Sequence, residues 1–190
     1  MIKRTIDITV VFFAVILATP LITLTFLMVK LTSPGPAIYW SQRVGQKNKI
    51  FNMPKFRSMR LGTPQIATHL MNQQSKPDQF LTPVGGFIRK SSLDELPQLW
   101  SVLTGDMSLV GPRPALFNQE DLIALRTEKG VHVLKPGITG WAQINGRDEI
   151  PIPQKVALDA YYLHHQSLLL DIKIIVLTVI KVLRRDNITH

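Results

Sequence analysis

Residues 8–29, "ITVVFFAVILATPLITLTFLMV", form an apolar run of 22 residues without a charged side chain. A helix that crosses a bilayer needs about 20 such residues, so this segment is long enough to enter lipid. A cleaved signal peptide is disfavoured, because the run is longer than an ordinary signal core and no small-residue cleavage site follows it. The run therefore predicts a segment that lies in the membrane.

The topology of this segment depends on Pro20 and on the charges that flank it. Pro20 removes a helical hydrogen bond near the middle of the run, and Thr19 can offer its hydroxyl to the freed carbonyls. Basic residues lie on both sides of the run: Lys3, Arg4, Lys30, Arg43, Lys47, Lys49, Lys55, Arg57 and Arg60. Because basic flanks stay in the cytoplasm, they favour a re-entrant helix that turns back at Thr19-Pro20. Proline also occurs in ordinary spans, so a spanning helix stays open from the residues alone.

The composition limits what the rest of the chain can be. With 190 residues, 45% of them hydrophobic, the chain can bury one sizeable core. Lys and Arg number 22 against 13 Asp and Glu, and the net charge of +9 favours an anionic partner such as nucleic acid, phospholipid or a phosphorylated substrate. The lack of cysteine excludes disulfides and thiolate metal sites.

After an exit turn that ends near residue 36, residues 37–190 are expected to form one α+β unit, mostly helical with a small β-hairpin. β-Branched and aromatic residues on both sides of residues 45–48 predict the hairpin. The other expected elements are helices at 92–103 and 117–129, a loop at 61–81 with a helical turn around 66–71, and a glycine-punctuated loop at 135–147.

The C-terminal stretch Ser167 to Arg185 is apolar but carries Asp171, Lys173 and Lys181, which makes a bilayer span unfavourable. These charges gather on one helical arc and leave a wide apolar face. Such a helix can lie in the membrane interface or pack against a core, and both alternatives stay open.

Asp94 and Glu95 are adjacent in "SSLDELPQLW", residues 91–100. Ser92 and Glu95 have the spacing of a capping box, which predicts a helix start. Adjacent helical side chains are about 100° apart, so the two carboxylates cannot form a facing acid and base pair and need separate roles. An Asp can attack phosphorus covalently, and a neighbouring carboxylate can bind Mg²⁺ or orient the first. A simple helix cap and a phosphoryl-transfer centre are both compatible with this stretch.

No Walker loop and no G-x-G-x-x-G motif is present, so phosphate must be held in another way. The candidates are cations at turns and segment ends: Lys55, Arg57, Arg89, Lys90, Arg113 and Arg147. A nucleic-acid-binding protein more often shows a basic helix or interleaved aromatics, so nucleic acid is not expected as a partner. The adjacent His164 and His165 point to different faces, which disfavours a histidine metal site.

A series of motifs along nearly the whole chain resembles one family, the bacterial sugar transferases, which are small monotopic phosphoglycosyl transferases. The motifs are, in order, "KRTID", "SPGP", "QRVG", "KFRSM", "IRKSSLDELPQL", "GDMSLVGPRP", "KPGITGWAQINGR" and "LDIKI". A coincidental series of this length is implausible. The chain departs from the family pattern at Thr19, where Ser is usual, and at Pro54, Phe80 and Ser101, none of which touches the Asp94-Glu95 pair.

The resemblance implies a re-entrant membrane helix, here broken at Thr19-Pro20, and a catalytic unit on the cytoplasmic face of the bacterial inner membrane. It also implies Mg²⁺, bound by the dyad of Asp94 and Glu95. In the family the Asp attacks the β-phosphate of a UDP-sugar, UMP leaves, and polyprenyl (undecaprenyl) phosphate takes the phosphosugar. By position, Asp94 is the expected nucleophile. The expected substrate-binding residues are Lys55, Arg57, Arg89, Arg113 and Arg147.

The function implied is the first step of bacterial glycoconjugate synthesis, such as that of O-antigen, capsule, exopolysaccharide or a glycoprotein glycan. The expected partners are a UDP-sugar, polyprenyl phosphate and membrane lipids. The alternative from another class is a non-catalytic basic membrane scaffold that binds anionic lipids. A scaffold explains the charge and the apolar run, but not "SLDELPQL" together with "GPRP".

Overall fold

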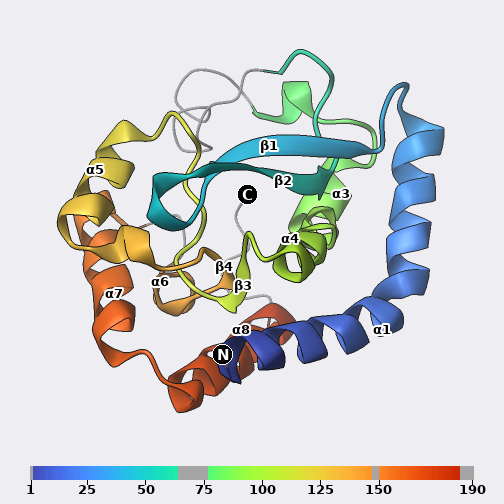
Figure 1. The fold of residues 1–190 in the computed structure, drawn as a ribbon. Helices are drawn as coiled ribbons and strands as arrows, with labels where there is room; N and C mark the ends of the chain where they lie inside the picture. The colour runs from blue at the N-terminus through green and yellow to red at the C-terminus, as the bar shows by residue number, and fades with distance from the viewer. Residues whose placement is uncertain (1, 64–76, 147–149, 185–190) are drawn as a thin grey trace.

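The computed structural model describes residues 2–63, 77–146 and 150–184 (Figure 1). Its elements are, in chain order, α1 (Ile2–Thr32), β1 (Ile38–Val44), η1 (Gln46–Asn48), β2 (Ile50–Phe56), η2 (Pro77–Phe80), α3 (Gly85–Lys90), η3 (Leu93–Glu95), α4 (Gln98–Thr104), β3 (Ser108–Val110), α5 (Glu120–Glu128), η4 (Val131–Val133), β4 (Gly137–Thr139), α6 (Trp141–Ile144), α7 (Ile152–His165) and α8 (Leu168–Arg184). The predicted α+β class, mostly helical with small sheets, is confirmed.

The apolar run forms most of α1, a single helix with Pro20 inside it. Figure 1 shows that α1 is bent: its first part runs along the lower edge of the view, and its second part rises beside α3 and α4. Pro20 frees the carbonyl of Ile16. The Thr19 hydroxyl instead donates to the Val15 carbonyl at 2.8 Å, so the carbonyl predicted as its acceptor was wrong by one residue. A back-bonded hydroxyl of this kind favours bending, so the predicted break is a bend within a continuous helix.

The N-terminal end of α1 is held by polar side chains. Lys3 pairs with Asp171 of α8 at 2.6 Å. The buried Asp7 accepts a hydrogen bond of 2.7 Å from the hydroxyl of Ser108 in β3. Arg4 donates to two carbonyls at the C-terminal end of α4, where the helix dipole favours a cation. The first turns of α1 are therefore part of the same packed unit as β3, α4 and α8; the domain boundary at residue 36 stays a prediction.

The strands β1 and β2 pair antiparallel, with Ile38 opposite Phe56 and Val44 opposite Ile50, which confirms the predicted hairpin. The strands β3 and β4 pair in parallel, so the prediction of a continuous loop at 135–147 was wrong. The glycines that suggested a loop instead allow close backbone approach. A Cβ on Gly137 would lie 2.1 Å from the amide nitrogen of Gly111.

The helices differ from prediction mainly in their limits. The helix expected at 117–129 is shorter and begins at Glu120, and the helix α7 was not predicted. The expected helical turn at 66–71 lies outside the described residues.

The C-terminal helix α8 agrees with the predicted stretch 167–185. It turns Ile174 inward and exposes an apolar stripe that consists of Leu169, Ile172, Val176 and Val179.

Two buried clusters join α1 to the rest of the molecule. The first half of α1 contributes Val11, which packs with Met53 of β2 and Val102 of α4. The second half contributes Val29, which packs with Phe56 and Ile88. Among the described residues α1 is the one helix long and apolar enough to cross a membrane. These clusters place β2, α3 and α4 next to one another, and the dyad lies between α3 and α4.

Candidate active site

The dyad lies in a strained turn rather than at a helix cap. Ser92 has a left-handed backbone with φ 56°, and Leu93–Glu95 form a 3₁₀ turn before α4 begins at Gln98. An N-cap needs an extended backbone, and Ser92 makes no capping hydrogen bond, so the predicted capping box was wrong. The Ser92 hydroxyl oxygen is buried and has no hydrogen-bond partner among the described residues. Strain of this kind in a non-glycine residue is typical of functional sites.

Glu95 is held by two cations from distant parts of the chain. One carboxylate oxygen, Oε1, accepts from Lys55 Nζ at 2.8 Å and from Arg113 Nη2 at 3.1 Å. Lys55 belongs to β2, and Arg113 follows β3 in the "GPRP" loop. Burial alone would raise the pKa of Glu95, but the charges and hydrogen bonds of Lys55 and Arg113 hold that pKa well below its ordinary value. Glu95 is therefore an ionised anchor that brings β2 and the "GPRP" loop to the dyad.

Asp94 has a different environment from its neighbour. Its side chain is buried, with 7% of the residue exposed, and among the described residues it accepts no hydrogen bond. Burial raises the pKa of Asp94 to about 6; the Lys55 charge lowers it, the Glu95 charge raises it, and Arg89 and Arg113 lower it. At pH 7 the carboxyl is therefore mostly ionised, although no described residue donates a hydrogen bond to it. A carboxylate in this state is available to attack an electrophile.

The predicted substrate-binding cations do not all lie together. Lys55 and Arg113 contact the dyad, and Arg89, in the last turn of α3, is close enough for its charge to lower the pKa of Asp94. Arg147 lies outside the described residues.

Arg57 is placed elsewhere: it is 4% exposed, and its guanidinium donates to the carbonyl and the hydroxyl of Ser33 and to the carbonyl of Pro34. Its hydrogen bonds thus hold the exit turn of α1, and its predicted role in substrate binding is not supported by a position at the dyad.

The donor chemistry of the dyad fits Mg²⁺ in one specific way. No group of three or more His, Cys, Asp or Glu side chains able to hold a metal occurs among residues 2–63, 77–146 and 150–184. Mg²⁺ that acts on phosphates often uses only one or two carboxylates and completes its shell with water and substrate oxygens. Asp94, buried and without a hydrogen bond, and its neighbour Glu95 can supply these carboxylates.

A buried ion pair behind the "GPRP" loop was missed by the sequence-based prediction. Arg126 of α5 and Asp159 of α7 are 8% and 1% exposed, and their side chains meet at 2.7 Å. A third contact runs from Arg126 Nη1 to the carbonyl oxygen of Arg113 at 2.8 Å. The sequence held a signal, because Arg126 follows Leu122 by four residues and Asp159 follows Val156 by three, so both charges fall on apolar helical faces.

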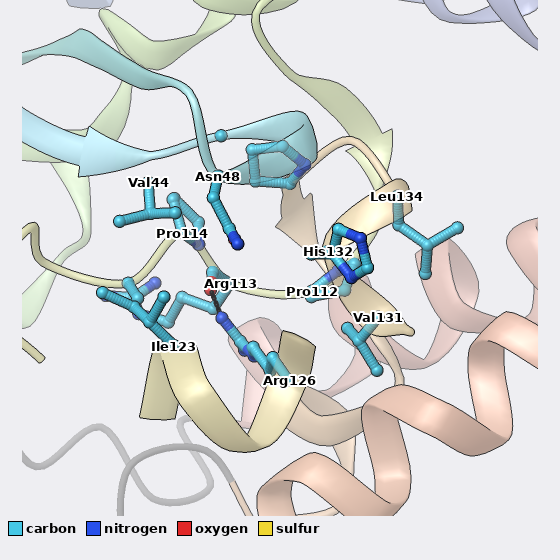
Figure 2. Close-up of a pocket in the computed structure, with 13 residues that line it drawn as sticks. Val44, Asn48, Pro112, Arg113, Pro114, Ile123, Arg126, Val131, His132 and Leu134 are labelled. Atoms are coloured by element: carbon cyan, nitrogen blue, oxygen red, sulfur yellow. Dashed lines mark hydrogen bonds between the residues drawn. The ribbon is translucent and has the colours of Figure 1, made fainter. Parts of the chain in front are cut away.

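The small pocket in Figure 2 lies beside this pair and is lined by the "GPRP" loop, the hairpin turn and η4. Its cavity volume of about 30 Å³ leaves room for water but not for a nucleotide. Asp94 and Glu95 do not line it. The dyad, rather than this pocket, is therefore the candidate active site.

Comparison with known proteins identifies the family of the chain. The model of the bacterial sugar transferase family matches residues 1–185. The uncharacterized sugar transferase EpsL of Bacillus subtilis (strain 168) is 43% identical over 189 residues, which cover 98% of this chain and 89% of that protein. The undecaprenyl-phosphate galactose phosphotransferase of Salmonella typhimurium is 40% identical over 198 residues, 97% of this chain and 41% of that protein.

A third relative is the UDP-glucose:undecaprenyl-phosphate glucose-1-phosphate transferase of Escherichia coli (strain K12). It is 41% identical over 188 residues, which cover 95% of this chain and 40% of that protein. The chain thus spans most of the Bacillus relative but about two fifths of the length of the two phosphotransferases. From the family match and these identities, the chain belongs to the bacterial sugar transferase family.

Proposed function

We propose that this protein transfers a sugar-1-phosphate from a UDP-sugar to polyprenyl phosphate and releases UMP. The observation that carries this proposal is the pair of unlike carboxylates in one turn. Asp94 is buried and accepts no hydrogen bond from the residues that the structure describes, whereas Glu95 is anchored by Lys55 and Arg113. The relatives named as undecaprenyl-phosphate sugar transferases support the reaction class. The reaction starts glycan assembly on the lipid carrier.

In the first step an oxygen of the Asp94 carboxylate attacks the β-phosphorus of the UDP-sugar. The bond between this phosphorus and the oxygen that bridges to the α-phosphate breaks, and UMP leaves with that oxygen. In the second step a phosphate oxygen of the polyprenyl phosphate attacks the same phosphorus. The bond to Asp94 then breaks, which restores the carboxylate and forms a polyprenyl-diphosphate sugar.

The surrounding residues have separate tasks in this scheme. Lys55 and Arg113 already converge on Glu95, so the same cations are placed to contact the diphosphate of the donor. Arg89 adds positive charge next to Asp94. Asp94 and Glu95 would hold Mg²⁺, and the ion, when bound, would neutralise charge on the phosphates and on the leaving group. Arg147 is a further proposed phosphate contact from the family pattern.

We also propose that α1 is re-entrant and that the catalytic unit lies on the cytoplasmic face of the bacterial inner membrane. Both ends of α1 bond to one unit, which supports this topology: Lys3 pairs with Asp171, and Arg57 donates to the exit turn at Ser33. A helix whose two ends contact the same unit enters and leaves on one side. The exposed apolar stripe of α8 suits the membrane interface.

The reaction is tested by UMP release from a panel of UDP-sugars with Mg²⁺ and polyprenyl phosphate. Donor alone should leave a phosphosugar adduct on the peptide that contains Asp94, visible by intact mass and peptide mapping. Silence across the whole panel, together with binding to anionic vesicles, would favour the non-catalytic scaffold. For topology, tags before Lys3 and after His190 should both be cytoplasmic, and a periplasmic N-terminal tag would contradict the re-entrant helix.

A further inference from the structure

The helix α7 presents two buried polar side chains to the segment that carries Arg113. Asp159 and Tyr162 are three residues apart, so they share one face of α7, and each is 1% exposed. Asp159 accepts from Arg126 Nε at 3.0 Å and from Arg126 Nη2 at 2.7 Å. The Tyr162 hydroxyl donates to Asp171 Oδ1 at 2.5 Å and also lies 3.4 Å from the carbonyl oxygen of Val110. One helix face thus reaches both ends of the segment Val110–Arg113, at one end directly and at the other through Arg126.

Arg126 connects α7 to this segment. Two of its guanidinium nitrogens face Asp159, and the third, Nη1, donates to the Arg113 carbonyl at 2.8 Å. Figure 2 shows Arg126 pointing from α5 toward Arg113, with this hydrogen bond drawn as a dashed line. The guanidinium of Arg126 therefore bonds both to Asp159 and to the backbone of Arg113. The side chain of Arg113 in turn contacts Glu95.

Prolines on both sides limit how the backbone around Arg113 can be held. Pro112 and Pro114 flank it, and neither has an amide hydrogen to donate. Pro114 also restricts Arg113 to extended conformations. The carbonyls on either side are also held: that of Pro112 accepts from the Gly137 amide at 2.9 Å, and that of Pro114 accepts from Arg43 Nη1 at 3.2 Å. The hydrogen bond from Arg126 differs from these in that it acts on the carbonyl of Arg113 itself.

A buried ion pair joins two helices only at a large cost in desolvation free energy. Apolar side chains of similar volume often join helices as well or better, because a buried pair loses its hydration. Burial raises the pKa of Asp159 even against the opposing charge of Arg126, which is a sign of this cost. The contact with the Arg113 carbonyl is a task that an apolar pair could not perform.

We propose that the buried pair Arg126–Asp159 is a positioning device that aims the Arg113 guanidinium at Glu95 and at the phosphates of the donor. Arg126 and Asp159 touch neither substrate nor dyad in this arrangement and act through the Arg113 backbone. The proposal rests on the proposed function for its kinetic test, and a second test is independent of any activity.

The kinetic test is a double-mutant cycle in the full-length protein. The pair is replaced by Arg126→Met with Asp159→Leu, which leaves no buried charge behind. We expect kcat/KM for the UDP-sugar to fall about tenfold in this variant and by about ten- to a hundredfold in Arg113→Ala. If the pair acts through Arg113, adding Arg113→Ala to the pair variant should lower kcat/KM little further than Arg113→Ala alone. Independent, multiplying losses would overturn the proposal.

Two controls separate positioning from general destabilisation. Val29→Ala removes buried volume in another cluster without touching residues 110–114, so its effect should multiply with that of Arg113→Ala. Arg126→Lys keeps the charge opposite Asp159 but loses the fork. It should recover more melting temperature than kcat/KM; equal recovery of both would argue for a purely structural pair.

The activity-independent test is hydrogen exchange of the full-length protein in detergent. In the pair variant the amide of Gly111 should exchange at least about tenfold faster, because the segment loses an anchor, whereas the amides of β1 and β2 should keep their protection. Unchanged exchange at Gly111, or equal loss across the hairpin, would overturn the proposal even if no UDP-sugar reacts. A silent UDP-sugar panel with faster exchange at Gly111 would reject the proposed function and leave the positioning intact.

Discussion

Asp94 and Asp159 are two buried aspartates in contrasting regions of the molecule. Burial raises the pKa of both, that of Asp94 to about 6. At the α5–α7 interface Asp159 accepts two hydrogen bonds from one guanidinium, whereas in the dyad turn Asp94 accepts none among the described residues. A buried carboxylate without donors does not help the chain to fold, so its value lies in what it can do to a ligand. We therefore assign Asp159 a structural role and Asp94 a role in the proposed reaction.

The cations repeat this contrast. Arg113 donates to Glu95 of the dyad. Arg126, which lies behind it, donates to Asp159 and to the Arg113 carbonyl. Arg57 likewise bonds within the protein, to Ser33 in the exit turn of α1. An arginine in a loop is therefore a better candidate for substrate binding when its guanidinium faces the dyad than when it bonds to backbone elsewhere.

The largest effect should come from Asp94→Asn, which removes the nucleophilic charge and keeps the size of the side chain. We expect UMP release to fall by about three orders of magnitude or more, equivalent to about 4 kcal/mol of the barrier. Asp121→Asn, an exposed aspartate at the start of α5, is the matched control and should keep normal turnover. Near-normal turnover in Asp94→Asn, with deamidation excluded by intact mass, would end the covalent mechanism and remove the contrast.

The reverse pattern is expected at the other aspartate. Asp159→Asn leaves the Arg126 charge buried without its counter-ion, which should cost about 3 kcal/mol of folding free energy. In a chain of this size the melting temperature in detergent should fall by roughly 6 to 12 °C. If Asp159→Asn melts like the wild type, the pair is not architectural and the comparison between the two aspartates fails.

Arg113→Ala should lower kcat/KM for the UDP-sugar by about one to two decades, since a charged hydrogen bond to phosphate is worth roughly 1.5 to 3 kcal/mol. Most of the change should be in KM for the donor rather than for polyprenyl phosphate. Arg113→Lys should rescue only partly, because an ammonium cannot form the bidentate fork. Equal changes in both KM values would indicate general misfolding instead.

A pH experiment in the presence of chelator tests the burial of Asp94. Its pKa rises from 3.8 to about 6 on folding, so the folded state holds the proton more tightly. The stabilisation that this proton provides is full below about pH 4 and is lost as the pH rises through about 6. Asp94→Asn, which is always neutral, should therefore gain roughly 3 kcal/mol over the wild type at pH 7 and little at pH 4. Melting curves over this range measure the gain, and a constant difference between the two proteins would contradict the raised pKa.

The smallest kinetic effect is expected for Arg57→Ala. Because its donors hold the exit turn of α1, the change should lower the melting temperature and leave KM for the UDP-sugar within about twofold of the wild type in the folded protein. Kinetics corrected for the folded fraction measure this. A rise in KM comparable to that of Arg113→Ala would restore Arg57 to the substrate-binding set.

Features that depend on neighbours in the chain were predictable. The apolar run, the hairpin around residues 45–48 and the C-terminal amphipathic helix follow from local patterns of polarity, and the structure contains all three as α1, β1–β2 and α8. The capping box at Ser92 and the loop at 135–147 were wrong for a common reason. In each, a local preference was overruled by a contact from a distant segment: Glu95 bonds to Lys55 and Arg113, and Gly137 pairs with β3.

The sequence by itself determined which groups are available: an apolar helix with a proline, two adjacent carboxylates and a set of arginines at turns. Only the tertiary structure decided which of these groups are free to react. Lys55 and Glu95 are 40 residues apart, Arg126 and Asp159 are 33 apart, and no local pattern records that they meet. Long-range packing brings these buried charges together. Among the described residues it gives Asp94, the buried carboxylate of the dyad, no hydrogen-bond donor. The difference between a structural and a reactive carboxylate is set by desolvation and hydrogen bonding, which exist only once the chain has folded.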